Sequence, residues 1–288
     1  MKKFLIIPGL PRCATTSFTQ ILGQHPEIFL PKIKESLYFF PHKNKYYMFN
    51  RKGEKVPFDK SGFINTKKEF NANYNGFKDD CIYIDGSTLY ASHHDSINEI
   101  HKQKDIDPYF IILKRDPFKR AVSHYLYSVS RGEEFRKFDE ALNDEKNGLH
   151  QNWLLKGYLA GSDSSECEDK IKELWGESRL ITVNIDTDNV FSQSFMNQVL
   201  ANLNLDNFLF DFQETANTLT YATNPVMREI RIIFKRVRQL KPALFDNKFT
   251  RVFFNAFMKS IASDKDIYKQ YMQYESLYYE LFNNRVSA

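Results

Sequence analysis

Cysteine is scarce in this 288-residue sequence, which contains only Cys13, Cys81 and Cys167. Their wide spacing matches neither a metal-binding pattern nor a disulfide framework, and it predicts free thiols in a reducing compartment. The 7 histidines also lack the close spacing of a zinc site. We therefore expect neither a bound metal nor a small fold held together by disulfides.

Long hydrophobic runs are missing as well. No window approaches the roughly 20 apolar residues that a helix needs to cross a bilayer. Residues 4–7 are apolar and follow two lysines, but this run ends at Pro8 and Gly9 and is too short for the core of a signal peptide. We interpret residues 4–7 as the first strand and expect a cytoplasmic protein without a transmembrane segment.

Charge of one sign does not dominate the sequence. The 40 basic and 36 acidic residues leave a net charge of +4, which is too small to predict binding to a nucleic acid. Hydrophobic residues, in contrast, are plentiful at 42%, with aromatic residues at 15%. This composition is typical of a packed globular protein, and the length allows a large core.

Strand and helix patterns alternate along the first two thirds of the sequence. Strand-like runs occupy residues 4–7, 28–30, 81–84, 109–113 and 179–185, and helical patterns occupy residues 15–24, 95–104 and 167–175. Such alternation predicts an α/β fold, a three-layer sandwich with a central parallel sheet. Residues 41–79 have no clear period and are expected to form a loop or short helices over one face.

The last third is mainly helical in pattern. The helical patterns lie at residues 191–203, 226–240, 251–260 and 267–282. We expect a single domain over residues 1–288. Its α/β core would occupy residues 1–205, and residues 206–288 would form a mainly helical C-terminal extension.

The most informative segment follows the first strand and reads Gly9-Leu-Pro-Arg12-Cys13-Ala14-Thr15-Thr16-Ser17. A strand, a tight loop and a helix N-terminus direct backbone N–H groups and the positive end of the helix dipole towards a phosphate or sulfate. The spacing is that of a P-loop, but Thr15 stands where the P-loop has its lysine. The positive charge lies instead at Arg12, whose guanidinium suits two parallel contacts with an anion. The missing lysine argues against ordinary ATP or GTP hydrolysis.

A purely structural interpretation of this segment is also open. A strand can pass into a helix through a turn of this kind without binding anything. In that case Thr15 or Thr16 would cap the helix with its hydroxyl group.

A second candidate anion site follows the strand of residues 109–113. The sequence continues Arg115-Asp-Pro-Phe-Lys-Arg120-Ala-Val-Ser123-His-Tyr, in which Asp116 and Pro117 predict the start of a helix. Arg115 would lie at the carboxyl edge of the sheet, where α/β proteins hold their ligands. Ser123, about two helical turns further on, could contact the same anion. Arg120 or Lys119 is expected to pair with Asp116, and an ordinary helix start without a ligand is the alternative.

Together these segments resemble sulfotransferases that use 3′-phosphoadenosine 5′-phosphosulfate (PAPS). Residues 115–125 are similar to the 3′-phosphate motif of that family, and residues 11–16 are similar to its 5′-phosphosulfate loop. Further segments resemble carbohydrate sulfotransferases, at residues 34–40 (Lys-Glu-x-x-x-Phe-Phe), 83–90, 157–158 and 180–183. The resemblance covers roughly residues 1–205 and implies the P-loop-like fold of this family.

Three positions depart from the family pattern, and one of them is Arg12, which stands where many members have a lysine. Ala14 replaces a loop glycine, so the backbone must pass the phosphate with a methyl group in place. Gly86 stands where several carbohydrate sulfotransferases have a lysine that contacts the sulfuryl region. Lys34 or a lysine within residues 41–78 is the candidate for supplying that charge.

The resemblance implies an in-line transfer of a sulfuryl group from PAPS to an acceptor hydroxyl, helped by positioning and electrostatics and requiring no metal. It assigns Arg12 to the bridging and sulfuryl oxygens, and Arg115 and Ser123 to the 3′-phosphate. The 5′-phosphate is assigned to the backbone N–H groups of Cys13, Ala14, Thr15 and Thr16 and to the hydroxyls of Thr15 and Thr16. Ser17 is also expected to bind the donor.

The same resemblance makes Glu35 the candidate general base, which would take the proton of the acceptor hydroxyl. The alternative for Glu35 is an ordinary charge on a surface loop. Because other branches of the family use histidine as the base, His42, His93 and His94 are reserve candidates.

The expected acceptor is a carbohydrate hydroxyl, with a lipid or a small phenol as alternatives. The aromatic residues that could stack on a sugar, or simply pack, are Tyr46, Tyr47, Phe49 and Tyr74. Two other functions remain open, a P-loop nucleotide kinase and a non-catalytic module that binds a nucleotide or glycan. The sequence indicates no oligomeric state.

Overall fold

The computed structural model describes residues 1–41, 43–49, 55–57, 64–75, 77–78, 80–131, 134, 136–149, 157–212, 269 and 271–286. Its centre is a five-stranded sheet in which every neighbouring pair is parallel, in the order β2-β5-β1-β6-β7. The strands are β1 (Lys2–Ile6), β2 (Ile28–Phe29), β5 (Ile82–Asp85), β6 (Ile106–Lys114) and β7 (Leu180–Asn184). All five coincide with the predicted strands, so the predicted α/β class is confirmed.

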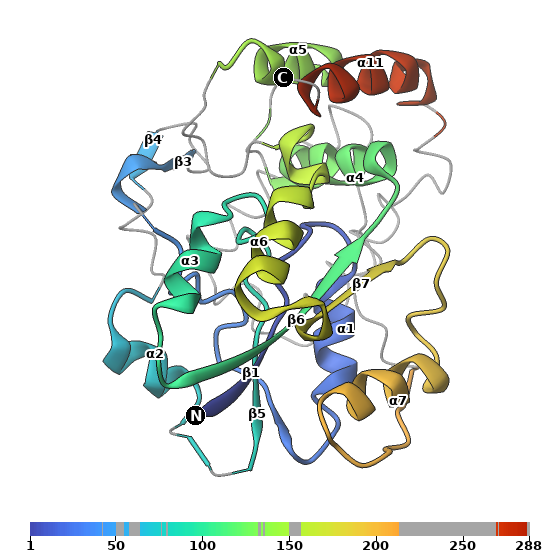
Figure 1. The fold of residues 1–288 in the computed structure, drawn as a ribbon. Helices are drawn as coiled ribbons and strands as arrows, with labels where there is room; N and C mark the ends of the chain where they lie inside the picture. Colours follow the sequence, from blue (N-terminus) through green and yellow to red (C-terminus); the bar gives the residue numbers. More distant parts are fainter. Residues whose placement is uncertain are drawn as a thin grey trace, which may run out of the picture.

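Helices cover both faces of the sheet. From β1 the chain passes through α1 (Thr15–Leu22) to the β2 and β5 side. It then returns through α3 (Asp95–His101) to β6 on the other side of β1, and through α6 (Ser165–Trp175) to β7. Because such crossovers are right-handed, α3 and α6 share one face and α1 lies on the other. Figure 1 shows α3 and α6 together in front of the sheet, which gives the predicted three layers.

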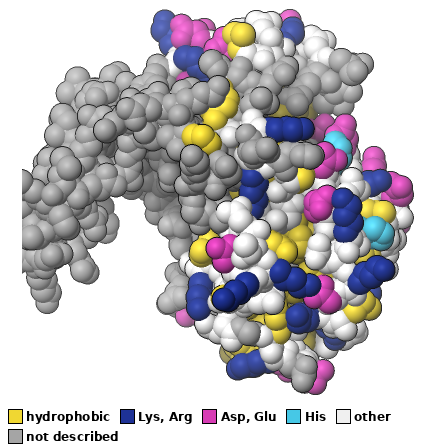
Figure 2. All heavy atoms as spheres, turned by 90° about the vertical axis from the view of Figure 1, so that its left-hand side faces the viewer, with side chains coloured by type: hydrophobic (Ala, Val, Ile, Leu, Met, Phe, Trp, Pro, Cys, Tyr) yellow, Lys and Arg dark blue, Asp and Glu magenta, His cyan; other side chains and the backbone are white. Residues whose placement is uncertain are grey.

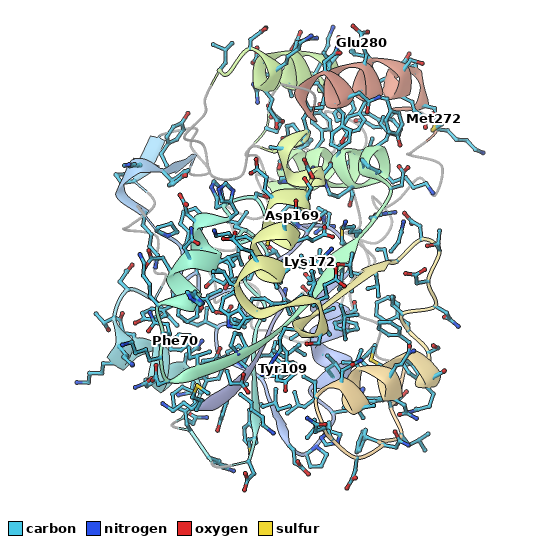
Figure 3. The ribbon with its side chains drawn as sticks, in the orientation of Figure 1. Phe70, Tyr109, Asp169, Lys172, Met272 and Glu280 are labelled. Carbon is cyan, nitrogen blue, oxygen red and sulfur yellow. The ribbon has the colours of Figure 1, made fainter. Side chains whose placement is uncertain are left out.

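The helices follow the apolar periodicity of their sequences. In α6, Cys167 and Ile171 are buried against the sheet, whereas Asp169 and Lys172 lie on the solvent side (Figure 3). The predicted helix at residues 191–203 is α7 (Gln193–Asn202), and its Phe195 ring lies 6.3 Å from the Phe18 ring of α1. The N-cap Ser192 accepts a hydrogen bond from the N–H of Phe195.

An aromatic cluster fills the core beside β1. The Phe4 ring lies 5.7 Å from that of Phe70 in α2 (Lys67–Asn73) and 5.5 Å from that of Tyr74. Tyr74 is buried, and its hydroxyl donates to the carbonyl oxygen of Ile84 at 2.9 Å. Tyr74 is therefore part of the core, which agrees with the packing alternative for this residue and not with stacking on a sugar.

A second apolar cluster joins the C-terminal helix to the middle of the chain. It is formed by α4 (Pro117–Arg131), α5 (Phe138–Lys146) and α11 (Glu275–Val286). Figure 1 shows α5 and α11 side by side above α4. Tyr278 of α11 is completely buried, and its ring lies 5.7 Å from that of Phe118. The C-terminal helix thereby braces the helix that carries Ser123.

Some elements were not predicted from the sequence. The antiparallel hairpin of β3 (Tyr47–Phe49) and β4 (Lys55–Pro57) lies in the segment expected to be a loop or short helices, in which only the short helix α2 agrees with the prediction among the described helices and strands longer than one turn, and α5 was missed as well. The short helices are η1 (Lys43–Lys45), η3 (Ala160–Ser162), η4 (Glu177–Arg179) and η6 (Met272–Tyr274). The helices predicted at residues 226–240 and 251–260 lie outside the described residues. Among the helices that are described, none has the length and hydrophobicity needed to cross a membrane.

Candidate anion-binding and catalytic site

The carboxyl ends of three neighbouring strands carry the residues singled out in the sequence. The loop with Arg12 follows β1, Gly86 follows β5, and Arg115 follows β6. The order in which the chain adds strands to the sheet reverses at β1, because β5 lies on one side of it and β6 on the other. Open α/β sheets bind ligands at such a reversal, outside the carboxyl ends of the strands.

The loop after β1 delivers an open helix N-terminus. Ala14 is the N-cap residue of α1 and has the left-handed conformation, with φ 57° and ψ 18°. No side chain caps the helix, so the interpretation of Thr15 or Thr16 as its cap was wrong. The N–H groups of the first helical turn have no intrahelical partner and carry the positive end of the dipole. This arrangement suits a phosphate or sulfate group.

Arg12 links this loop to α4. Its Nε lies 3.3 Å from Oγ of Ser123 and donates to it, and its guanidinium lies 4.7 Å from the centre of the Tyr127 ring. The two segments predicted separately to bind anions therefore meet at a direct contact. Tyr127 was not predicted as part of the site, because nothing in its local sequence pattern distinguishes it from a packing aromatic residue.

Arg115 is held at the sheet edge by an acidic residue from the loop after β7. Its Nε lies 3.7 Å from Oδ1 of Asp186, and Oδ2 of Asp186 accepts a hydrogen bond from the N–H of Asp116 at 2.8 Å. Asp116 in turn caps α4 by accepting from the N–H of Lys119 at 2.8 Å. The predicted cap is thus confirmed, whereas Asp186 was missed because it is distant in sequence.

Arg120 does not pair with Asp116, and Lys119, the other residue predicted for this pairing, contacts Asp116 through its backbone N–H. The guanidinium of Arg120 is completely buried and donates to the hydroxyl of Ser162 at 2.7 Å and to the carbonyl oxygens of Gly157 and Tyr158 at 2.6 and 2.8 Å. The side chain points from α4 towards residues 157–162. Burial lowers the pKa of Arg120, but its hydrogen bonds offset part of the cost of burying the charge.

Cys13 lies among the arginines of the site. The thiol is buried, and burial raises its pKa to about 12 although the nearby charges of Arg120, Arg115 and Arg12 act in the opposite direction. The thiol therefore stays protonated at neutral pH and is a poor nucleophile. The backbone N–H of Cys13 donates to the carbonyl oxygen of Leu10 at 3.2 Å, and a part for Cys13 in binding the 5′-phosphate stays a prediction.

Lys34 and Glu35 approach the same loop from the segment after β2. Nζ of Lys34 donates to Oγ1 of Thr15 at 3.2 Å and lies 3.6 Å from Oε1 of Glu35. Oε2 of Glu35 accepts from the hydroxyl of Thr88 at 3.1 Å. The Glu35 side chain is 41% exposed, so its carboxylate is open to a molecule from solvent.

A buried carboxylate anchors this segment to the sheet. Asp85, at the end of β5, accepts hydrogen bonds from the hydroxyls of Ser36, Ser87 and Tyr90. Ser87 also accepts from the N–H of Leu37 at 3.0 Å. Burial raises the pKa of Asp85, whereas these hydrogen bonds favour its ionised form. The network fixes the backbone that directly follows Glu35.

The other candidates lie elsewhere or are engaged. The His93 ring packs on Phe40, and its Nδ1 lies 3.3 Å from the hydroxyl of Tyr46. Nδ1 of His94 lies 3.0 Å from Oε2 of Glu166. Tyr47 is buried, His42 lies outside the described residues, and of Phe49 only the backbone is described. Within the described ranges, no cluster of three or more His, Cys, Asp or Glu side chains is placed to hold a metal ion.

The fold is that of the sulfotransferases, as the motifs predicted. The crystal structure of a sulfotransferase from Alicyclobacillus acidocaldarius matches with a TM-score of 0.63 and 19% identity, over 87% of this chain and 99% of that one. The sulfotransferase domain from the curacin biosynthetic pathway is a weaker match, with a TM-score of 0.44 and 12% identity over 76% and 78% of the two chains. No protein-family model matches the sequence, and no curated protein is significantly similar to it. At these identities the likeness concerns the fold, and the chemistry has to be inferred from the side chains.

Proposed function

We propose that this protein is a sulfotransferase that moves a sulfuryl group from PAPS to an acceptor hydroxyl. The contact between Arg12 and Ser123 is the observation that carries this proposal. It joins two anion-binding segments that are 111 residues apart in the sequence. A donor with phosphate groups on both its 5′ and 3′ positions needs two such segments within one nucleotide of each other.

In this proposal the loop and the start of α1 bind the 5′ end of the donor. The backbone of residues 13–17 and the hydroxyls of Thr15 and Thr16 hold the 5′-phosphate, and Arg12 contacts the bridging and sulfuryl oxygens. Arg115 and Ser123 bind the 3′-phosphate. Asp186 orients Arg115, since a carboxylate 3.7 Å from its Nε restricts the guanidinium to one side.

The reaction is an in-line displacement at sulfur. Glu35 accepts the proton of the acceptor hydroxyl while the acceptor oxygen forms a bond to sulfur. The bond between sulfur and the bridging phosphate oxygen breaks, and its electron pair stays on the phosphate. The products are a sulfate ester, adenosine 3′,5′-bisphosphate and the proton on Glu35. Arginine side chains stabilise the charge that develops on the leaving phosphate, so no metal is required.

The acceptor proposed here is a carbohydrate hydroxyl. This choice is supported by the resemblance of residues 34–40 and 83–90 to the segments of carbohydrate sulfotransferases. The exposed carboxylate of Glu35 is compatible with a bulky acceptor that arrives from solvent. Lipids and phenols are the acceptors that a transfer experiment must include beside glycans.

The donor site can be tested with two nucleotides and three variants. Ser123→Ala and Arg115→Ala should each weaken the binding of adenosine 3′,5′-bisphosphate by about 10-fold or more, as expected for the loss of a charged hydrogen bond. Binding of AMP, which has no 3′-phosphate, should hardly change. Lys119→Ala, an exposed charge on the same helix, is the matched control. Equal losses for both nucleotides would contradict the 3′-phosphate assignment.

A further inference from the structure

Lys34 reaches the position that a P-loop lysine would serve, but it does so from a different segment. Thr15 occupies the place of that lysine in the loop, and Nζ of Lys34 lies 3.2 Å from its Oγ1. Thr15 is also the first residue of α1, where the backbone N–H groups are open to an anion. The ammonium group therefore lies at the helix N-terminus although Lys34 follows β2.

Gly86 makes room for the Lys34 side chain. A Cβ atom on residue 86 would lie only 3.0 Å from Cε and 3.2 Å from Cγ of Lys34. The methylene groups of Lys34 thus pass directly over the backbone of Gly86 on their way to Thr15. A Cβ atom at residue 86 would force the Lys34 side chain to shift by a few tenths of an ångström.

The surroundings of Lys34 favour an anionic ligand. Its side chain is 23% exposed, and burial lowers its pKa while the neighbouring Glu35 carboxylate acts in the opposite direction. An ammonium group has three N–H donors. The hydroxyl of Thr15 and the carboxylate of Glu35 account for two directions, which leaves donor capacity for an anion on the loop.

We propose that Lys34 is a direct ligand of the 5′-phosphosulfate group of the donor, and that Gly86 permits this by leaving its side chain unobstructed. This inference rests on the proposed function and adds a cation to the transfer step. As the bond between sulfur and the bridging oxygen breaks, negative charge develops on the 5′-phosphate. An ammonium group held beside Thr15 stabilises that charge. The contact with Glu35 also keeps the candidate base and the donor end in one arrangement.

The test compares ligands with and without a 5′-phosphate by equilibrium titration. Lys34→Ala should weaken the binding of adenosine 3′,5′-bisphosphate by about 10- to 100-fold, as does the loss of other hydrogen bonds to charged groups. Binding of adenosine 3′-monophosphate should stay unchanged, because it lacks the 5′ group. Lys32→Ala removes an exposed lysine of the same segment and should change neither affinity. Thermal unfolding of each variant checks that it remains folded.

A second substitution tests the part assigned to Gly86. Gly86→Ala should weaken the binding of the bisphosphate several-fold when Lys34 is present. It should have no further effect on this binding in the Lys34→Ala background. Such non-additivity is expected only if the two residues act through one contact. Additive losses would overturn the role of Gly86.

The possible failures can be told apart. If the wild-type protein binds the bisphosphate and Lys34→Ala binds it equally well, the inference about Lys34 is overturned while the proposed donor stands. If Lys34→Ala weakens the binding of both nucleotides equally, Lys34 acts on the fold of the site and is not a ligand of the 5′ group. If the wild-type protein does not bind the bisphosphate, the proposed function fails and the role of Lys34 fails with it.

Discussion

Glu35 shows how contacts of a single residue limit its role. Its carboxylate is oriented on one side by Thr88 and on the other by Lys34, at 3.1 and 3.6 Å. These contacts hold it beside the loop that would bind the donor, and its exposure leaves it accessible to an acceptor. Held in this way, the carboxylate can take a proton without first rearranging, as a general base requires.

Replacement of this carboxylate should separate catalysis from binding. Glu35→Gln should lower the turnover of sulfuryl transfer by about 100-fold or more, which is typical for loss of a general base. Affinity for adenosine 3′,5′-bisphosphate should stay close to that of the wild type, because Gln keeps the shape of the side chain. Glu27→Gln, at an exposed position, is the control for loss of one carboxylate. Unchanged turnover in Glu35→Gln would remove Glu35 from the mechanism.

Single residues also show where sequence patterns lose information. The cap at Asp116 could be predicted because it depends on neighbours three residues away. The inward direction of Arg120 could not, because its partners Gly157 and Ser162 come from another part of the chain. A charged residue in a helix is expected on the solvent side, and the hydrogen bonds to that distant segment offset part of the free energy that its burial costs.

At the level of elements, short connections fix the segment that carries Lys34 and Glu35. Ser36, which follows Glu35, is tied to Asp85, and the chain continues to Phe40, whose ring lies 4.7 Å from the His93 ring. His93 precedes α3, so this packing joins the segment to a helix that covers the sheet. Burial, assisted by the nearby His94, lowers the pKa of His93 to about 4.

This shift predicts a pH dependence of stability. Well above pH 6.5, His93 is neutral in both the folded and the unfolded states, so its protonation does not change the free energy of unfolding. As the pH falls towards 4, the unfolded chain takes up a proton that the folded protein does not, so stability is lost. Compared with high pH, the free energy of unfolding should be lower by about 2 kcal/mol at pH 5 and by about 3 kcal/mol below pH 4.

Urea unfolding at several pH values measures this effect. His93→Gln removes the titrating ring, so the free energy of unfolding of the variant should fall less steeply than that of the wild type between pH 6.5 and 4. Titration of carboxylates is common to both proteins and cancels in the difference. Parallel curves for the two proteins would show that His93 titrates normally in the fold.

The described elements divide into those fixed locally and those fixed by distant contacts. Strand β6 could be predicted from its run of apolar residues. Helix α1 could be predicted from its apolar periodicity and from the turn of glycine and proline residues before Arg12. The β3–β4 hairpin lies in a polar segment whose residues give no alternating pattern, and it depends on pairing between strands. Secondary structure that is set by its partner strand leaves little trace in its own sequence.

On the scale of the whole molecule, the site depends on parts from both ends of the described chain. The loop after β1 supplies Arg12, and the C-terminal helix α11 supplies Tyr279, whose hydroxyl donates to Oδ2 of Asp116 at 2.9 Å. Asp116 caps the helix that carries Ser123, so α11 supports the proposed 3′-phosphate site through one intermediate residue. The sequence predicted helix near this end but gave no reason to connect it with the site.

The mixed distribution of charged side chains over the molecule is compatible with a small anionic ligand. Figure 2 shows basic and acidic side chains interspersed over the described part of one face. The net charge of +4 is small for the size of the chain. The concentration of positive charge that matters is local, at Arg12, Lys34 and Arg115 beside the carboxyl ends of the strands.

Transfer of labelled sulfuryl groups from PAPS to a panel of glycans, lipids and phenols tests the central claim most directly. We expect the wild-type protein to label a hydroxyl acceptor, with carbohydrates foremost, and to release adenosine 3′,5′-bisphosphate in equal amount. A chelator should leave this activity unchanged. Phosphoryl transfer from ATP with Mg²⁺ and indifference to PAPS would contradict the account in favour of a kinase. Binding of the bisphosphate without transfer to any acceptor would contradict it in favour of a non-catalytic binding protein.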